Sequence, residues 1–283
     1  MKKLLPWTLP LLALLFSSTL HAEIVTLTLP NSLVARADFR PGKPEKPAVL
    51  LLHGFLQTLD SPSVSRLANN LSSEGYTVLT PTLTLGVTYR SQSVACEAIN
   101  HHTVADGEAE IKAWVDWLKA RKARQIVLGG HSLGNAYILS YLTNSPDNAI
   151  SKFIGISIVE GSLKAGEQAR SGLINRLRGK AASGDREIVE EQFTYCQKFR
   201  ATPNCLLSYM EWGPDRILSS INKTRIPVTM IMGSKDDRLG ADWLDRLKKT
   251  RAKVVLIQGA NHFMDGQYEF DLMDYFLAEL QGI

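Results

Sequence analysis

The sequence predicts an α/β protein in which a mostly parallel central sheet is covered by helices on both faces. Segments with strand patterns and segments with helix patterns alternate along most of the chain. Several strand segments are continuous apolar runs, such as Ala48–Leu52, which is typical of strands that are buried on both faces. Alternation of this kind indicates parallel strands joined by helices that pack on the two faces of the sheet.

The composition of the 283 residues is that of a folded globular protein, with 45% hydrophobic and 21% charged residues. Lys and Arg number 32 and Asp and Glu number 28, which gives a formal net charge of +4. Loss of Lys2 and Lys3 with an export signal would leave 30 − 28 = +2. Because the charge is small and no long basic run is present, we expect no nucleic-acid partner.

Residues 1–22 have the three-part pattern of a secretory signal. Lys2 and Lys3 are followed by the mostly apolar run Leu4–Phe16, and Ala22 offers a small residue at a cleavage site before Glu23. We therefore expect a mature α/β domain over residues 23–283 that is periplasmic or secreted.

A retained membrane anchor is the alternative to cleavage. A helix that spans a membrane needs about 20 apolar residues, whereas this run is shorter and contains Pro6 and Pro10. The first cysteine, Cys96, lies far beyond the run, which excludes a lipoprotein anchor. We expect no stable membrane anchor after cleavage, and the oligomeric state is left open.

In the N-terminal half, each expected element follows from its apolar pattern. Helical spacing places Val64, Leu67 and Leu71 on one side of the first helix, while short apolar runs indicate strands. Pro81 is expected to end the strand that precedes it. The expected elements, in order, are strands Ile24–Leu29, Leu33–Phe39 and Ala48–Leu52, helix Ser61–Glu74, strand Tyr76–Leu79, helix Val104–Ala120, strand Gln125–Leu128 and helix Ser132–Leu142.

The C-terminal half continues the alternation after one long interruption. The expected elements are strands Phe153–Ile158 and Pro227–Met232, helix Trp243–Lys249, strand Val254–Ile257 and helix Tyr268–Leu280. More than 60 residues separate the first two strands, which is too long for one crossover. We expect a helical cap insertion at about residues 162–215, with helices at Ala165–Lys180 and Glu187–Phe199, that covers one end of the sheet. The alternative is an elaborate crossover with no covering role.

The segment that indicates a catalytic function is Gly130-His131-Ser132-Leu133-Gly134. It lies between an expected strand and an expected helix, where flanking glycines permit a very tight turn that exposes the Ser132 hydroxyl. A serine hydroxyl needs a base and a group that orients the base. His262 follows a later strand, and Asp236 and Asp237 follow another. Loops at the carboxyl ends of parallel strands share one crevice, so these side chains are expected to meet.

The sequence resembles the α/β-hydrolase superfamily from about Ala48 to the C-terminus. The matching pieces, which occur in the family's order, are Leu50-Leu51-Leu52-His53-Gly54-Phe55, Gly130-His131-Ser132-Leu133-Gly134, Gly233-Ser234-Lys235-Asp236 and Gly259-Ala260-Asn261-His262. The resemblance implies that Ser132 is the nucleophile, His262 the base and Asp236 the acid. The family's spacing after the glycine selects Asp236 over Asp237, and the insertion falls where the family commonly carries a cap.

The same resemblance implies an oxyanion hole formed by the backbone N–H groups of Phe55 and Leu133. We therefore expect a secreted serine hydrolase that cleaves an ester-type acyl bond of a small-molecule substrate and needs no cofactor. Thioesterase and peptidase activity remain alternatives on the same residues, and a non-catalytic binding protein of this fold is a third.

Other candidate residues are expected to play structural parts. His53 is expected to support the fold, His131 to shape the pocket, and the Arg and Lys side chains of the insertion to be solvated. Tyr209, Met210 and Trp212 are candidates for the wall of an acyl pocket. A cluster formed by Cys96, Glu97, His101 and His102 matches no zinc spacing, so no metal site is expected, although the two histidines could lie at the mouth of the site.

Three cysteines allow at most one intrachain disulfide. Cys196 and Cys205 lie within the insertion, and the Pro203-Asn204 turn signal between them favours their pairing. A bond from Cys96 to either of them, or no bond, remains an alternative. Export to an oxidising compartment makes one disulfide plausible.

Overall fold

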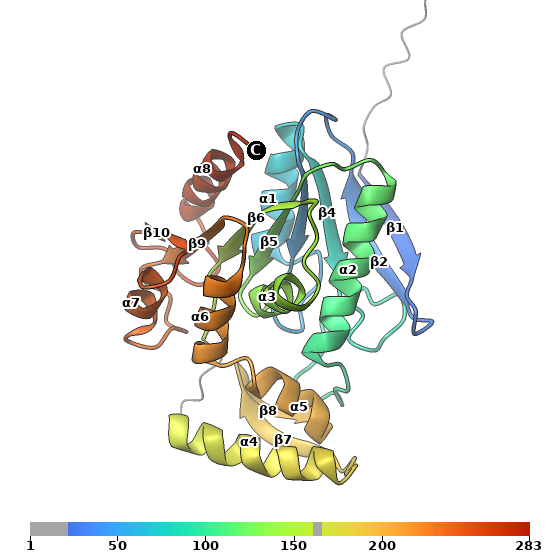
Figure 1. Ribbon diagram of the computed structural model, residues 1–283, viewed down its shortest axis with the longest axis vertical. Coiled ribbons are helices and arrows are strands. Elements are labelled where there is room, and N and C mark those ends of the chain that lie inside the picture. Colours follow the sequence, from blue (N-terminus) through green and yellow to red (C-terminus); the bar gives the residue numbers. More distant parts are fainter. Residues whose placement is uncertain (1–21, 161–165) are drawn as a thin grey trace, which may run out of the picture.

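The computed structural model describes residues 22–160 and 166–283. Its centre is an eight-stranded sheet with the strand order β1-β2-β4-β3-β5-β6-β9-β10 (Figure 1). Strands β4, β3, β5, β6, β9 and β10 run parallel, while β1 and β2 pair antiparallel at one edge. The predicted α/β fold with a mostly parallel sheet is therefore confirmed. The strands are β1 Glu23–Thr28, β2 Val34–Arg40, β3 Ala48–Leu52, β4 Thr77–Thr82, β5 Ile126–His131, β6 Ile150–Ile156, β9 Val228–Gly233 and β10 Lys253–Ile257.

Helices cover both faces of the sheet. Alternate residues of β3 point to opposite sides, Val49 and Leu51 into one apolar cluster and Leu50 and Leu52 into the other. The first cluster is closed by α1 Pro62–Ser73 and α8 Tyr268–Leu280. The second is closed by α2 Val104–Ala120, α3 Gly134–Asn144, α6 Pro214–Lys223 and α7 Trp243–Lys248. Trp114 and Trp117 belong to this second cluster, and the centroids of their rings are 5.8 Å apart.

The expectation that Pro81 ends its strand is wrong. β4 continues to Thr82, and Pro81 pairs with Ala37 of β2. Pairing of β4 with β3 stops at Leu79, so beyond that residue β4 has a neighbour on one side only. A proline that lacks an N–H is tolerated where one side of the strand needs no donor.

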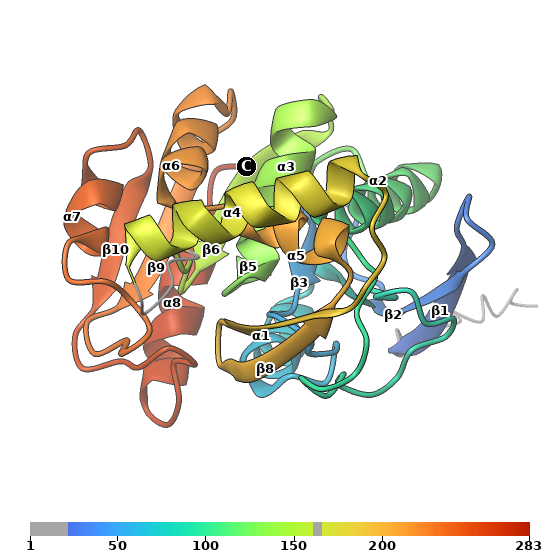
Figure 2. The same ribbon diagram turned by 90° about the horizontal axis from the view of Figure 1, so that it is seen from below.

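The insertion forms a cap at one end of the sheet (Figures 1 and 2). It contains α4 Glu167–Ala182, the hairpin β7 Val189–Phe193 and β8 Cys196–Ala201, and α5 Pro203–Met210. The expected helix at Glu187–Phe199 is therefore wrong, because this segment is the antiparallel hairpin. Val189 and Phe193 are four residues apart, which is helical spacing, but valine, threonine and aromatic residues favour strands, and the hairpin buries Phe193 and Phe199.

The disulfide joins Cys96 to Cys196, so the favoured Cys196–Cys205 pairing is wrong. Pro203 does not turn the chain back but begins α5, and Thr202 Oγ1 caps that helix by accepting from the Cys205 N–H. The extended strand β8 then carries the chain away from Cys196, by about 3.3 Å per residue. Cys205 is a free, buried thiol whose Sγ lies 3.0 Å from the His102 carbonyl oxygen.

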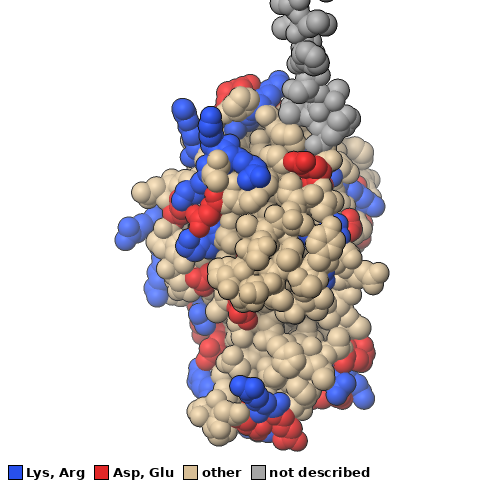
Figure 3. All heavy atoms as spheres, turned by 90° about the vertical axis from the view of Figure 1, so that its right-hand side faces the viewer, with Lys and Arg blue, Asp and Glu red and all other residues tan. Residues whose placement is uncertain are grey.

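Residues 83–103, between β4 and α2, form a long irregular connection on the side of the molecule where β1 and β2 lie (Figures 1 and 2). Arg90 and Glu97 are its only formally charged residues. One view of the surface shows a centre largely free of charged side chains, with Lys, Arg, Asp and Glu gathered toward its margins (Figure 3). No helix within residues 22–160 and 166–283 is long and apolar enough to cross a membrane. The predicted signal segment lies outside the described residues, apart from Ala22.

Candidate active site

Ser132 occupies a strained turn directly after β5. Its φ is +55°, in the left-handed region that residues other than glycine rarely adopt. The turn is tight because α3 begins against the end of β3, and a Cβ on Gly134 would lie 2.4 Å from the His53 carbonyl oxygen. The glycine is therefore required by the close approach of the two backbones, which holds the serine at the carboxyl end of the sheet.

The structure brings Ser132, His262 and Asp236 into one hydrogen-bonded row. His262 Nε2 lies 2.9 Å from Ser132 Oγ, and His262 Nδ1 lies 2.8 Å from Asp236 Oδ2. The three residues come from loops after β5, β10 and β9. All three are buried, so the imidazole is held between its partners with little exposure to competing water. A neutral imidazole that donates from Nδ1 to a carboxylate presents Nε2 as an acceptor for the serine hydroxyl.

Asp236 and Asp237 have different surroundings. The second carboxylate oxygen of Asp236 accepts from the Arg238 N–H at 3.0 Å, so a local turn fixes the plane of the carboxylate. Asp237 is exposed and lies at the wall of the adjoining pocket instead. The structure thus places Asp236, and not Asp237, beside His262.

Asn135, which the sequence did not single out, supports the turn from below. Its Nδ2 donates to the carbonyl oxygens of Ser132, at 2.8 Å, and Ile156, at 3.0 Å. The side chain is fully buried beneath the turn. Its position directly after Gly134, at the start of a buried helix, is the signal that could have identified it, because a buried amide needs partners.

His131 supports the loop that carries His262. Its Nε2 lies 3.1 Å from the His262 carbonyl oxygen, and the centroids of the two tilted imidazole rings are 5.1 Å apart. Burial, with a further contribution from the nearby His262, lowers the pKa of His131 to about 3. His131 is therefore neutral and donates through Nε2. It lies at the wall of the pocket, as expected.

The loop after β3 lies directly against the serine. A Cβ on Gly54 would be 3.3 Å from Ser132 Cβ, so the next residue, Phe55, is also close to the serine. Among the described residues, neither the Phe55 N–H nor the Leu133 N–H has an acceptor. Both residues are buried. The two amides therefore keep their donor capacity near Ser132.

His53 fixes the start of this loop. Its Nδ1 lies 2.8 Å from the Gly54 carbonyl oxygen, and its Nε2 accepts from the Leu83 N–H at 3.1 Å. Burial lowers the pKa of His53 to about 3, and the nearby Arg90 charge adds to the effect. A neutral His53 can donate from one nitrogen and accept at the other, which matches both bonds. These contacts agree with the expectation that His53 supports the fold.

Arg90 holds the same loop and is a second residue that sequence reasoning missed. Its guanidinium donates to the carbonyl oxygens of Leu83, at 2.7 Å, Gln57, at 2.7 Å, and Gln92, at 2.8 Å, with a longer bond to Leu56. The side chain is buried, and burial lowers the pKa of Arg90 to about 10, so the group stays charged at neutral pH. Its position as the only Arg or Lys among residues 83–103 is the sequence signal for a buried arginine whose guanidinium is bound by carbonyl oxygens.

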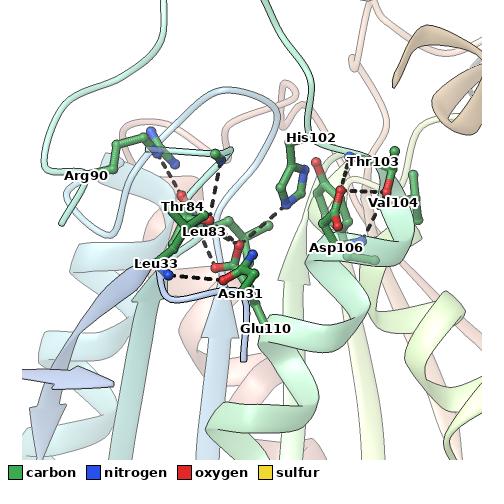
Figure 4. Close-up of polar contacts among 12 residues, drawn as sticks. Asn31, Leu33, Leu83, Thr84, Arg90, His102, Thr103, Val104, Asp106 and Glu110 are labelled. Carbon is green, nitrogen blue, oxygen red and sulfur yellow. Dashed lines mark hydrogen bonds and ion pairs between the residues drawn. The ribbon is translucent and has the colours of Figure 1, made fainter. Parts of the chain in front are cut away.

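The connection that carries Arg90 is anchored to α2 by buried polar contacts (Figure 4). Glu110 accepts from the Thr84 hydroxyl at 2.5 Å and lies 3.5 Å from His102 Nε2. Thr103 and Asp106 form a capping box at the start of α2. The connection is therefore held near both of its ends, although it contains no helix or strand.

A pocket of about 860 Å³ opens at Ser132 and His262. Its wall is mixed in character, with aromatic rings from Phe55, Tyr195 and Phe263 among many polar groups. The polar and charged side chains in the wall are Gln57, Glu160, Thr194, Gln197, Lys235, Asp237, Arg238 and Asn261.

Several expected neighbours of the site lie elsewhere. Tyr209, Met210 and Trp212 are buried and do not line the pocket, and Tyr209 packs behind Phe55 instead. His101 and His102 do not reach its mouth either, because His102 is buried beside Glu110. No group of three or more His, Cys, Asp or Glu side chains in the described part of the chain is placed to hold a metal ion.

A family model described as "Alpha/beta hydrolase family" matches residues 49–269. The chain belongs to the alpha/beta hydrolase family. The matched range begins in β3 and includes Ser132, Asp236 and His262, so the family assignment covers both the sheet and the loops described above. Comparison with curated protein sequences finds no significant match.

Solved structures of other alpha/beta hydrolases share the fold. Est1E from Butyrivibrio proteoclasticus is 17% identical, with a TM-score of 0.64 over 92% of this chain and 98% of that one. The thioesterase domain from the curacin biosynthetic pathway is also 17% identical, with a TM-score of 0.58 over 92% and 99%. The bromoperoxidase from Bacillus anthracis is 17% identical, with a TM-score of 0.62 over 92% and 100%. Since these names cover several reactions on one fold, the chemistry of this hydrolase must be argued from its site.

Proposed function

We propose that this protein is a serine hydrolase that cleaves an ester-type acyl bond of a small-molecule substrate. Ser132 is the nucleophile, His262 the general base and Asp236 the acid that orients the base. The observation that carries the proposal is the unbroken row of two hydrogen bonds, 2.9 Å and 2.8 Å long, from Ser132 through His262 to Asp236. Such a row activates a hydroxyl that is otherwise a weak nucleophile.

The reaction follows from these contacts in two halves. Ser132 Oγ attacks the substrate carbonyl carbon while its proton passes to His262 Nε2, and the tetrahedral intermediate carries its negative charge on the former carbonyl oxygen. His262 returns the proton to the leaving oxygen as the C–O bond breaks. Water then gives a proton to His262 and attacks the acyl-enzyme, which releases the acid and restores Ser132.

The N–H groups of Phe55 and Leu133 are proposed to bind the negatively charged oxygen. They have no acceptor among the described residues, and both lie beside the serine. One donor of this kind contributes about 2.7–4 kcal/mol to the stability of the transition state. The positive end of α3 adds to the same field.

The polar residues in the pocket wall favour a polar substrate over one with a long saturated chain. Lys235 and Arg238 are exposed, and neither has an ion-pair partner among the described residues. Arg238 also lies 4.7 Å over the Phe263 ring. Long aliphatic groups would leave such polar walls without partners, whereas an aromatic or hydroxylated acyl group would pair with both the rings and the polar groups.

Labelling with a fluorophosphonate probe tests the nucleophile, and peptide mapping should place the label on Ser132. A panel of acyl esters, thioesters and aminoacyl amides then tests the bond class, with the highest kcat/KM expected for esters. Ferulate esters belong in the panel because a structure of Est1E contains ferulic acid. Highest activity on thioesters or amides would instead favour the thioesterase or peptidase alternative, and absence of labelling would favour a non-catalytic binding protein.

We further propose that the protein is exported and loses residues 1–22. The charged, apolar and small-residue pattern before Glu23 and a disulfide in the mature part both support this proposal. N-terminal sequencing of the exported protein should begin at Glu23. A mature chain that retains Met1 would contradict it.

A further inference from the structure

Phe55, whose N–H is proposed to bind the oxyanion, has its ring enclosed by the cap. Four aromatic rings from the cap lie within 6 Å of the Phe55 ring: Phe193 at 5.2 Å, Phe199 at 5.3 Å, Tyr209 at 5.7 Å and Tyr195 at 5.9 Å. They belong to β7, the hairpin turn, β8 and α5. Phe55, three residues after the end of the core strand β3, is thus packed by rings from another part of the chain.

The cap also holds the Phe55 backbone directly. Tyr195, at the turn of the hairpin, donates from its hydroxyl to the Phe55 carbonyl oxygen at 3.1 Å. The aromatic rings fix the Phe55 side chain, and this bond fixes its carbonyl. The Phe55 N–H lies in one peptide plane with the Gly54 carbonyl, whose oxygen is held by His53 Nδ1 at 2.8 Å and the Gln57 N–H at 3.2 Å. The contacts from the cap hold Phe55, at the other end of this plane, so the direction of the N–H depends on the cap as well.

The next carbonyl of the loop is held by a different segment. The Leu56 carbonyl oxygen accepts from the Val94 N–H at 3.0 Å, two residues before Cys96. Cys196 directly follows Tyr195 in the hairpin, and the disulfide joins Cys96 to Cys196. The disulfide therefore links the two segments that hold the successive carbonyl oxygens of Phe55 and Leu56.

The segment that carries Cys96 also pairs with β8 through backbone hydrogen bonds beyond the disulfide. The Arg200 N–H donates to the Cys96 carbonyl oxygen at 3.3 Å, and the Asn100 N–H donates to the Arg200 carbonyl oxygen at 2.9 Å. The segment that carries Cys96 is in turn anchored to α2 through His102 and Glu110 (Figure 4). The hairpin turn is thus connected to the core through the disulfide and this pairing, close to Tyr195.

We propose that Tyr195 is a positioning residue for the oxyanion loop and that the Cys96–Cys196 disulfide holds it in place, which makes turnover depend on the redox state of this disulfide. The inference rests on the proposed function, because it assigns the Phe55 N–H to the oxyanion. Loss of the hydroxyl contact, or of the disulfide, lets the Phe55 N–H turn away from the oxygen that becomes charged.

Tyr195→Phe keeps the ring and removes only the hydroxyl, so the aromatic packing and the fold are retained. We expect kcat for the best ester to fall about tenfold with KM nearly unchanged, because a misdirected oxyanion donor costs less than the 10²–10³ that complete loss costs. Affinity for a boronic acid, which forms a tetrahedral adduct with the serine, should fall by a similar factor. Tyr275→Phe, at a half-exposed tyrosine of α8 whose hydroxyl has no hydrogen bond to any described residue, is the matched control and should change neither value.

The disulfide is tested by reduction with dithiothreitol, which gives two electrons and two protons to the S–S bond and becomes a cyclic disulfide itself. Reduction should lower the kcat of the wild-type protein about tenfold or less. The double variant Cys96→Ser/Cys196→Ser should have this low kcat without reductant and should not respond to it. Circular dichroism should show the same fold in every form.

Two results would overturn the inference while leaving the proposed function intact. In the first, Tyr195→Phe keeps the wild-type kcat and boronate affinity, or changes KM alone. In the second, reduction lowers the unfolding temperature but not kcat, which rejects the part assigned to the disulfide. If Ser132→Ala instead remains active and labelled, the proposed function itself fails, and that outcome is distinct from both.

Discussion

The loops that carry Ser132, Asp236 and His262 and the hairpin β7–β8 are held in place by different means. Each of the three loops begins where a strand of the central sheet ends, so neighbouring strands fix its starting point. Within the described residues, the hairpin pairs with itself and, at Cys96 and Asn100, with an irregular segment, and it relies on aromatic packing and one disulfide. The sheet therefore sets the positions of Ser132 and His262, whereas the loop that carries Phe55 depends on both regions.

Loss of the nucleophile should have the largest effect on the sheet side of this comparison. Ser132→Ala should reduce kcat on the best ester by about 10⁴ or more, because the acyl-enzyme can no longer form. Fluorophosphonate labelling should also disappear, while thermal unfolding should stay close to that of the wild type. A variant that keeps more than about a hundredth of the wild-type rate would show that the nucleophile is another residue.

The two adjacent carboxylates allow a matched pair of variants. Asp236→Asn should lower kcat by about 10²–10⁴, because an amide no longer holds His262 in the tautomer that accepts the serine proton. Asp237→Asn changes an exposed carboxylate at the pocket wall and should lower kcat by less than about threefold. Steady-state kinetics of the two variants decide the assignment, and the reverse order of their effects would contradict it.

Two substitutions that lower stability equally, one in the hairpin and one in the core, should have different effects on kcat. Phe199 of the hairpin and Phe276 of α8 are both fully buried, so replacing either with leucine should cost about 1–2 kcal/mol of unfolding free energy. Only Phe199→Leu loosens the rings around Phe55, so it alone should lower kcat, by roughly threefold to tenfold. Denaturant unfolding and kinetics on both variants give the result. Equal losses of kcat would mean that the cap has no special connection to the oxyanion loop.

The expected effect that leaves kcat aside is a loss of stability in mild acid that arises in the loops of the core. Burial lowers the pKa of His53 and of His131 to about 3, from an ordinary value of 6.5. Below pH 6.5 the unfolded chain therefore binds protons that the folded chain does not, so the free energy of unfolding should fall as pH falls from 6.5 toward 3. Each histidine contributes at most about 1.4 kcal/mol per pH unit within this window.

Unfolding by urea between about pH 7 and pH 5 measures this slope. Glu279 does not interfere, because its ordinary pKa is 4.5. Burial opposes its ionisation, but hydrogen bonds from Lys152, Lys253 and Thr229 lower the pKa of Glu279 to about 2, so its contribution is lost only in stronger acid. His131→Gln should reduce the slope, and substitution of the exposed His101 should leave it unchanged. A wild-type protein with no slope in this range would contradict buried neutral histidines.

The core was predictable because its signals are local. The apolar run of β3 and the glycine-bounded turn at Ser132 each lie within a few residues, and the two later strands lead directly to Asp236 and His262. The resemblance to α/β-hydrolases rests on these same pieces. Strand ends that meet at one edge of a parallel sheet then bring the side chains together without further information.

The cap was harder to predict because its contacts join distant parts of the chain. Cys96 and Cys196 are separated by 100 residues, and the Asn100 pairing with β8 is equally long-range. Glu and Gln around residue 190 favour a helix by local propensity, and tertiary packing of Phe193 and Phe199 overrides them. Arg90 was missed for a similar reason, since its four carbonyl partners are visible only once the loops are folded.

The third cysteine has a consequence for the chemistry of the other two. Thiol–disulfide exchange requires a thiolate, and burial, with a smaller contribution from Asp106, raises the pKa of the Cys205 thiol far above its ordinary value. In the folded protein Cys205 therefore remains protonated and unreactive, and we expect it not to attack the Cys96–Cys196 disulfide. Isomers with shuffled pairings should form only from chains that have first unfolded, and an alkylating reagent should modify one thiol per chain only after denaturation.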